Sequence, residues 1–139
     1  MRFSFRVLSV LWALIILVLS LIGGISLPDY SLFSLFTFDK LVHVFMYGVL
    51  TYLFISAGNQ QYSVLNLRYK LPILAATVAW VYGSIIELIQ AYLIPNRFGD
   101  IYDTIANLVG CFFGILAFQI LEKFLPFTNN TINGSKKIR

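Results

Sequence analysis

Four long apolar runs make up most of this chain, and they limit it to a small set of folds. They cover residues 7–22, 39–57, 71–93 and 100–121. A helix of about 20 predominantly apolar residues spans the hydrocarbon core of a bilayer. A segment in lipid must also satisfy its own backbone hydrogen bonds, which a helix does. The sequence therefore predicts an all-α integral membrane protein, built as a bundle of four transmembrane helices.

The composition agrees with a chain that lies mostly in lipid. Hydrophobic residues make up 59% of the 139 residues and charged residues 12%, whereas an average soluble domain is about 25% charged. The mean hydropathy is +0.83. We expect one membrane domain over residues 1–125 and a basic, disordered cytoplasmic tail over residues 126–139. No room remains for a separate soluble module.

The distribution of positive charge predicts the orientation of the bundle. The net charge is +4, and eight of the ten basic residues fall at chain ends or in loops that would share one side of the membrane. They are Arg2, Arg6, Arg68, Lys70, Lys123, Lys136, Lys137 and Arg139. Because basic loops stay on the cytoplasmic side, we expect both termini to be cytoplasmic. The same distribution favours a topology signal over nucleic-acid binding as the reason for the charge.

The segments around the first run allow a second interpretation. A basic start followed by an apolar stretch is also typical of a cleaved signal peptide, but no small-residue cleavage site is evident around residues 20–26. We favour a retained span.

In residues 25–38, aromatic residues alternate with small polar ones, which predicts an outer loop lying along the membrane interface between the first two helices. Residues 58–70 are polar and basic and predict an inner loop.

Small residues indicate where helices pack closely. Gly110 and Gly114 form a small-x-x-x-small pair in the fourth run, and Gly48 falls beside Tyr47 in the second. Cys111 is the only cysteine, so it forms no intrachain disulfide, and we interpret it as a packing residue.

Polar residues recur at helical spacing near the predicted outer ends of the second, third and fourth helices. Spacings of three, four and seven place them on one face of each helix. The set is Asp39, Lys40, His43, Tyr47, Glu87, Gln90, Arg97, Asp100, Asp103 and Asn107. At 1.5 Å per residue, the deeper members would lie roughly 6–12 Å below the helix ends. An ionised group costs roughly 2.5–3.5 kcal/mol at a bilayer centre on insertion scales, so these residues predict a protein-lined site that faces outward.

Three interpretations of this set remain open. It could be a closed network of ion pairs and hydrogen bonds that fixes helix pairing. It could bind the polar head group of a lipid, with Lys40, His43 and Arg97 meeting a phosphate or carboxylate. It could also perform acid/base chemistry, with Glu87 as the base, because burial raises a carboxyl pKa, and with His43 as its partner.

Other site classes find less support in the spacing of the residues. His43 is the only histidine and there is no H-x-x-x-H or H-E-x-x-H pattern, so we expect no metal site and no cofactor. No Ser/His/Asp triad, nucleotide loop or G-x-S-x-G is present, which leaves an enzyme uncertain and makes a non-enzyme the favoured interpretation.

The ordered motifs resemble those of the VanZ-like family of small bacterial membrane proteins. The match covers roughly residues 35–120, and it rests on the motifs Asp39-Lys40-x-x-His43-x-x-x-Tyr47, Glu87-x-x-Gln90 and Pro95-x-Arg97-x-x-Asp100-x-x-Asp103-x-x-x-Asn107-x-x-Gly110. The chain departs from the usual pattern at Asn96, where a small residue is common. The resemblance implies a multi-pass protein of the bacterial cytoplasmic membrane. It also implies a polar family signature, which comprises Asp39, Lys40, His43, Glu87, Gln90, Arg97, Asp103 and Asn107.

The resemblance also supplies a functional hypothesis. The family's named member is associated with resistance to teicoplanin-type glycopeptides, which act on cell-wall precursors at the outer membrane face, although the family's biochemical activity is not settled. We therefore expect the chain to bind an envelope lipid, a lipid-linked precursor or its head group through the outward polar set. The alternatives are a membrane enzyme that uses Glu87 and His43, and a structural network in a protein that acts through partners. The sequence gives no oligomeric state.

Overall fold

Four long helices form the part of the chain that the structure describes. The computed structural model describes residues 4–22, 32–61, 70–93 and 100–124. The helices are α1 (Phe5–Ile22), α2 (Leu32–Gln61), α4 (Leu71–Leu93) and α5 (Ile101–Phe124). Each is long and apolar enough to cross a membrane, and no strand occurs within these ranges. The prediction of an all-α, four-span membrane protein is therefore confirmed.

The ends of the helices follow from local sequence. Asp100 caps α5: its side-chain Oδ1 accepts a hydrogen bond from the backbone N–H of Tyr102 at 2.8 Å, and its carbonyl accepts one from Asp103 at 3.0 Å. At the other end, α5 stops at Phe124, two residues before Pro126, which cannot continue a helix. The predicted tail over residues 126–139 lies outside the described residues.

The start of α2 differs from the prediction. The sequence led us to expect a helix from near Asp39, but α2 begins at Leu32, so residues 32–38 of the predicted interfacial loop are helical. The reason is that no proline or glycine interrupts the chain between Leu32 and Gly48, and an aromatic-rich stretch continues the helix of the following span without a break. The rest of that loop, residues 25–31, lies outside the described residues.

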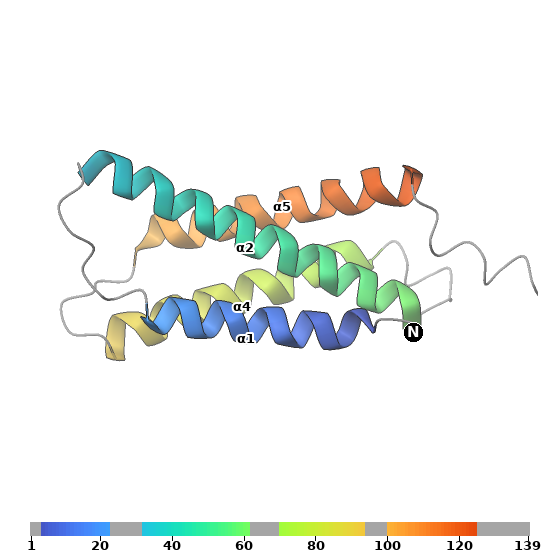
Figure 1. Ribbon diagram of the computed structural model, residues 1–139, viewed down its shortest axis with the longest axis horizontal. Helices are drawn as coiled ribbons and strands as arrows, with labels where there is room; N and C mark the ends of the chain where they lie inside the picture. Colours follow the sequence, from blue (N-terminus) through green and yellow to red (C-terminus); the bar gives the residue numbers. More distant parts are fainter. Residues whose placement is uncertain (1–3, 23–31, 62–69, 94–99, 125–139) are drawn as a thin grey trace, which may run out of the picture.

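The helices run along one common long direction, and α2 crosses α5 (Figure 1). The contact between α2 and α5 is the most extensive in the bundle, and α1 packs mainly on α2. α2, α4 and α5 bring one set of helix ends together, where α2 and α5 begin and α4 ends. We call this the cluster end. The start of α1 and the end of α5 both lie at the opposite end of the bundle (Figure 1).

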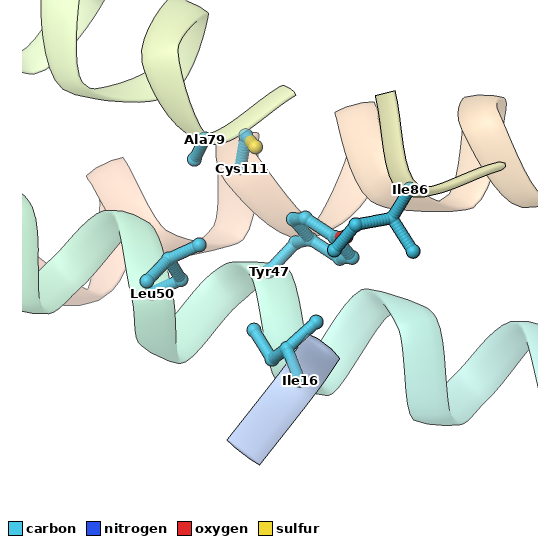
Figure 2. Close-up of a cluster of buried hydrophobic side chains, with 6 residues drawn as sticks. All are labelled: Ile16, Tyr47, Leu50, Ala79, Ile86 and Cys111. Carbon is cyan, nitrogen blue, oxygen red and sulfur yellow. The ribbon is translucent and has the colours of Figure 1, made fainter. Parts of the chain in front are cut away.

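The core lies where α1, α2, α4 and α5 meet. Figure 2 shows Tyr47 at its centre, with Ile16, Leu50, Ile86 and Cys111 among the buried side chains around it. Each of these side chains is at most 2% exposed. Because lipid supplies no hydrophobic drive for helix association, such close packing is what holds the helices together.

Hydrogen bonds to backbone carbonyls also join the helices. Trp12 of α1 donates its indole N–H to the Met46 carbonyl of α2 at 3.0 Å, and the Tyr82 hydroxyl of α4 donates to the Ala13 carbonyl of α1 at 2.7 Å. Trp80 of α4 donates to the Thr104 carbonyl of α5 at 3.2 Å. A polar atom in an apolar bundle is costly unless it is bonded, so these three bonds favour the observed pairings.

Candidate functional site

The predicted polar residues of α2, α4 and α5 meet at the cluster end. Six of them are buried within the bundle: His43, Tyr47, Glu87, Gln90, Asp103 and Asn107. Lys40 is mostly buried and Asp39 is about half exposed, because both lie closer to the end of the bundle. Helical spacing of four aligns Asp39 with His43, and spacing of three aligns Glu87 with Gln90. The sequence stripes therefore converge in space.

Lys40 of α2 bridges to the acidic start of α5. Its ammonium lies 2.6 Å from Asp100 Oδ2, donates a short hydrogen bond to Asp103 Oδ1, and lies 3.7 Å from Asp39 Oδ2. Three carboxylates thus surround one cation. Lys40 neutralises part of this negative charge and joins α2 to α5 at the cluster end of the bundle.

Asp100 shows the electrostatic effect of this arrangement. Partial burial alone would raise the pKa of its carboxyl, but the hydrogen bonds from Lys40 and from the backbone N–H of Tyr102 outweigh that effect. The nearby positive charges act in the same direction, so the pKa of Asp100 lies below its ordinary value. Asp100 is therefore ionised at neutral pH and remains a partner for the Lys40 ammonium.

His43 lies between carboxylates and an amide. Its Nδ1 lies 2.9 Å from Asn107 Oδ1, a hydrogen bond between two buried side chains, and 3.9 Å from Glu87 Oε1. Its Nε2 lies 4.0 Å from Asp39 Oδ1, too far for a hydrogen bond. Because an amide oxygen only accepts, the Nδ1 atom carries the proton in this arrangement.

Tyr47 is the innermost member of the α2 stripe and belongs to the core. Its ring stacks on the His43 ring with centroids 6.4 Å apart and an interplanar angle of 6°. Gly83 of α4 makes room on its other side: a Cβ there would lie 2.7 Å from Tyr47 Cε1 and 2.8 Å from Asn107 Nδ2. Tyr47 thus connects the polar cluster to the apolar core.

Gln90 joins the cluster to α1. Its Nε2 donates a hydrogen bond to the Ser20 carbonyl at 2.6 Å. Its Oε1 is buried and has no hydrogen-bond partner among the described residues, and the same is true of Asn107 Nδ2. A buried donor or acceptor left unpaired costs about 1–3 kcal/mol. Each of these two amide atoms therefore calls for a partner, such as a water molecule or a bound polar group.

Other predicted residues lie apart from this cluster or outside the described chain. Gly48, Gly110 and Gly114 lie at the α2–α5 crossing, where a Cβ on either α5 glycine would overlap the backbone of α2. Cys111 is buried beside them and is a free thiol. Arg97 lies outside the described residues, together with the rest of the turn at 94–99.

A family model described as VanZ/LLP1 matches residues 4–122 of the chain. The chain belongs to this family. Searches of the curated proteins and of the solved structures found no match. The VanZ/LLP1 match covers the four helices almost completely, and together with their length and apolar character it identifies a multi-pass membrane protein.

Two residues of this candidate site were not anticipated from the sequence. Gly83 lies four residues before Glu87 and seven before Gln90, so it shares their face of α4, and that spacing could have revealed it. Ser20 contributes only its backbone carbonyl, through the hydrogen bond from Gln90. Any residue offers a carbonyl, so no sequence signal could have identified Ser20.

Proposed function

We propose that the cluster end binds the polar head group of an envelope lipid. The observation that carries this proposal is the pair of buried, unpaired amide atoms, Gln90 Oε1 and Asn107 Nδ2, beside Glu87 and His43. One atom accepts hydrogen bonds and the other donates them. A head group with hydroxyl or amide functions can satisfy both, which offsets the cost of burying them.

The charges favour a head group that presents hydrogen-bond donors over a bare anion. Among the described residues, the cluster holds four carboxylates, Asp39, Glu87, Asp100 and Asp103, against Lys40 and His43. The Lys40 ammonium is engaged by Asp100 and Asp103. An approaching anion would meet a negative field, whereas hydroxyl and amine groups would find acceptors. A sugar or amino-acid head group has this chemistry.

A neighbouring groove suits the lipid chain. A cavity of about 440 Å³ lies between α2 and α5 and has an almost wholly apolar lining. On α2 its lining begins at Leu41, directly after Lys40, and continues to Tyr52, a length of about 16 Å along the helix. An acyl or prenyl chain in this groove would hold its head group near the cluster. Binding at the outer leaflet would then affect envelope composition or glycopeptide susceptibility.

Native mass spectrometry of the detergent-purified protein tests this function. Glu87→Gln keeps the shape of the side chain and removes its charge, so we expect the wild type to retain a specific lipid and a folded Glu87→Gln variant to lose most of it. Glu122→Gln is the matched control, because it removes a carboxylate near the other end of α5. If neither protein retains lipid and Glu87→Gln melts several degrees lower, the cluster is a structural network instead.

Two distances favour acid/base catalysis as the second candidate function. The His43 ring lies between Glu87 and Asp39, within 4.0 Å of an oxygen of each, so it is placed to exchange a proton with a bound substrate and to be stabilised when charged. The same variant separates the two functions. An enzyme with Glu87→Gln would still retain its lipid but would no longer convert it.

A further inference from the structure

We propose that Asp39, His43 and Asp103 form a binding site for a divalent metal ion. One carboxylate oxygen of each aspartate and one ring nitrogen of His43 lie within 4.8 Å of one another. Ligand atoms about 2.1 Å from a shared metal lie at most about 4.2 Å apart. His43 Nε2 and Asp39 Oδ1 are already 4.0 Å apart, and the Asp39 side chain is about half exposed, so it is free to adjust around a metal ion.

The ligands come from two helices, and this explains why sequence spacing did not reveal them. Asp39 and His43 lie four residues apart on α2, and Asp103 is in the first turn of α5. Motifs such as H-E-x-x-H carry two histidines on one helix, whereas α2 supplies one aspartate and one histidine. Here the crossing of α2 and α5 supplies the third ligand.

The orientation of His43 points to a cation. Asn107 Oδ1 accepts a hydrogen bond from Nδ1 at 2.9 Å, so Nδ1 carries a proton, and in the neutral ring the lone pair is on Nε2. The His43 side chain is 9% exposed, and among the described residues Nε2 has no hydrogen-bond partner. A metal-bound histidine normally donates its other ring N–H to an oxygen that fixes its orientation. Asn107 is in this position.

Lys40 acts as an internal competitor for the metal. Its ammonium contacts both metal-site carboxylates, Asp39 and Asp103, as well as Asp100. The position between these carboxylates therefore already selects a cation. On metal binding, the long Lys40 side chain would pair with Asp100 alone. One histidine with two carboxylates suits a metal such as Zn²⁺ or Mn²⁺.

Titration of the purified protein with Mn²⁺ tests this site directly. The full chain is purified in detergent without a histidine tag, treated with a chelator and titrated, and bound Mn²⁺ is followed by electron paramagnetic resonance. We expect binding at one site and displacement by Zn²⁺. Asp39→Asn, at a half-exposed position that should not disturb folding, is expected to weaken affinity about 10–100-fold, as loss of a metal-site group does.

Lys40→Met is expected to change the Mn²⁺ affinity in the opposite direction to Asp39→Asn. Removal of the competing ammonium should raise the Mn²⁺ affinity on the order of tenfold, because a unit charge within a few ångströms no longer repels the metal. If Lys40 has only a structural role, Lys40→Met should be less stable than the wild type but should not bind Mn²⁺ more tightly. Glu122→Gln is the control and should bind as the wild type does.

Two outcomes would overturn the proposal. One is the absence of Mn²⁺ binding by the folded wild type, and the other is equal binding by the wild type and Asp39→Asn, which would show adventitious binding elsewhere. Both measurements use Mn²⁺ without any lipid ligand, so their outcomes are independent of the lipid function proposed above.

Discussion

Asn107 connects the polar and apolar parts of the bundle through its two amide atoms. Its Oδ1 accepts a hydrogen bond from His43, while its Nδ2 lies near the α carbon of Gly83 and has no hydrogen-bond partner among the described residues. Asn107 is fully buried and Tyr47 is 1% exposed. Both side chains lie against Gly83 of α4, so the orientation of His43 depends on how closely α4 approaches here.

Substitution of Gly83 tests this dependence at the level of a single residue. A Cβ at Gly83 would lie 2.7 Å from the Tyr47 ring and 2.8 Å from Asn107 Nδ2. We expect Gly83→Ala to cost about 1–3 kcal/mol, the usual range for overpacking, and to lower the retention of lipid and metal because Asn107 must shift. The measurement is thermal unfolding in one detergent, together with the two binding assays.

Gly58→Ala is a matched control for Gly83→Ala. A Cβ at Gly58 would lie 2.6 Å from Leu71 Cδ1, but this atom is the end of a flexible side chain that can rotate away. Alanine also favours a helix by roughly 0.5–1 kcal/mol over glycine. Gly58→Ala should therefore be neutral or stabilising, and equal effects of the two substitutions would argue against the tight packing at Gly83.

The positions of the polar residues could be predicted from the sequence, but their individual partners could not. Spacings of three and four showed that His43 and Asp39 share a face, as do Glu87 and Gln90. Spacing on one helix gives no information on which atoms meet across helices. The sequence therefore left two roles open for Lys40, neutralising the acids or meeting a phosphate. Its ammonium is engaged by Asp100 and Asp103, as the first of these roles requires.

At the scale of the helices, the crossing of α2 and α5 sets the shape of the site. Lys40 reaches Asp103, and the backbones of Gly48, Gly110 and Gly114 come close together further along the same pair of helices. Small residues allow helices in a membrane to approach closely, which strengthens van der Waals contact. The glycines thereby hold the α2 and α5 polar residues within reach of each other.

Gly110→Ala tests this crossing. A Cβ at Gly110 would overlap the Val44 carbonyl oxygen and lie 3.0 Å from Val44 Cα. These are backbone atoms that cannot rotate aside, so the helices must separate. We expect a loss of about 1–3 kcal/mol in unfolding free energy, measured by thermal unfolding in detergent.

Substitution of the α2 glycine should destabilise the bundle less than substitution of the α5 glycine. A Cβ at Gly48 would lie 3.2 Å from the Gly110 carbonyl oxygen, which a shift of a few tenths of an ångström relieves. Gly48→Ala should therefore cost less than Gly110→Ala. If both variants have the same melting temperature as the wild type, α2 and α5 do not approach each other this closely.

The boundaries of the helices show where the sequence was ambiguous. The existence of four spans followed directly from their apolar length, which composition determines. The start of α2 could not be predicted in this way, because Phe and Ser in residues 32–38 are compatible with both an interfacial loop and a helix. The small-residue pair at Gly110 and Gly114 indicated close packing, but it did not indicate α2 as the partner.

At the scale of the whole molecule, the bundle is asymmetric along its length. The cluster end holds the buried acids and Lys40, while the described residues near the opposite end include Arg6, Lys70 and Lys123. Basic residues favour the cytoplasmic side of a membrane. We therefore predict that the cluster end faces outward, where it can receive a ligand or a metal ion from the cell exterior.

Thiol labelling in spheroplasts tests this orientation. Cys111 is buried, and Cys111→Ala provides a background without other thiols. Ser4→Cys and Lys123→Cys then report on one end of the bundle, and Tyr92→Cys, at a position that is 87% exposed near the end of α4, reports on the other. We expect a membrane-impermeant maleimide to label Tyr92→Cys in intact spheroplasts, and to label the other two only after permeabilisation. Labelling of Ser4→Cys and Lys123→Cys in intact spheroplasts would place the cluster end in the cytoplasm. The ligand would then have to be a cytoplasmic lipid or metal ion, and a direct role at the outer leaflet would be excluded.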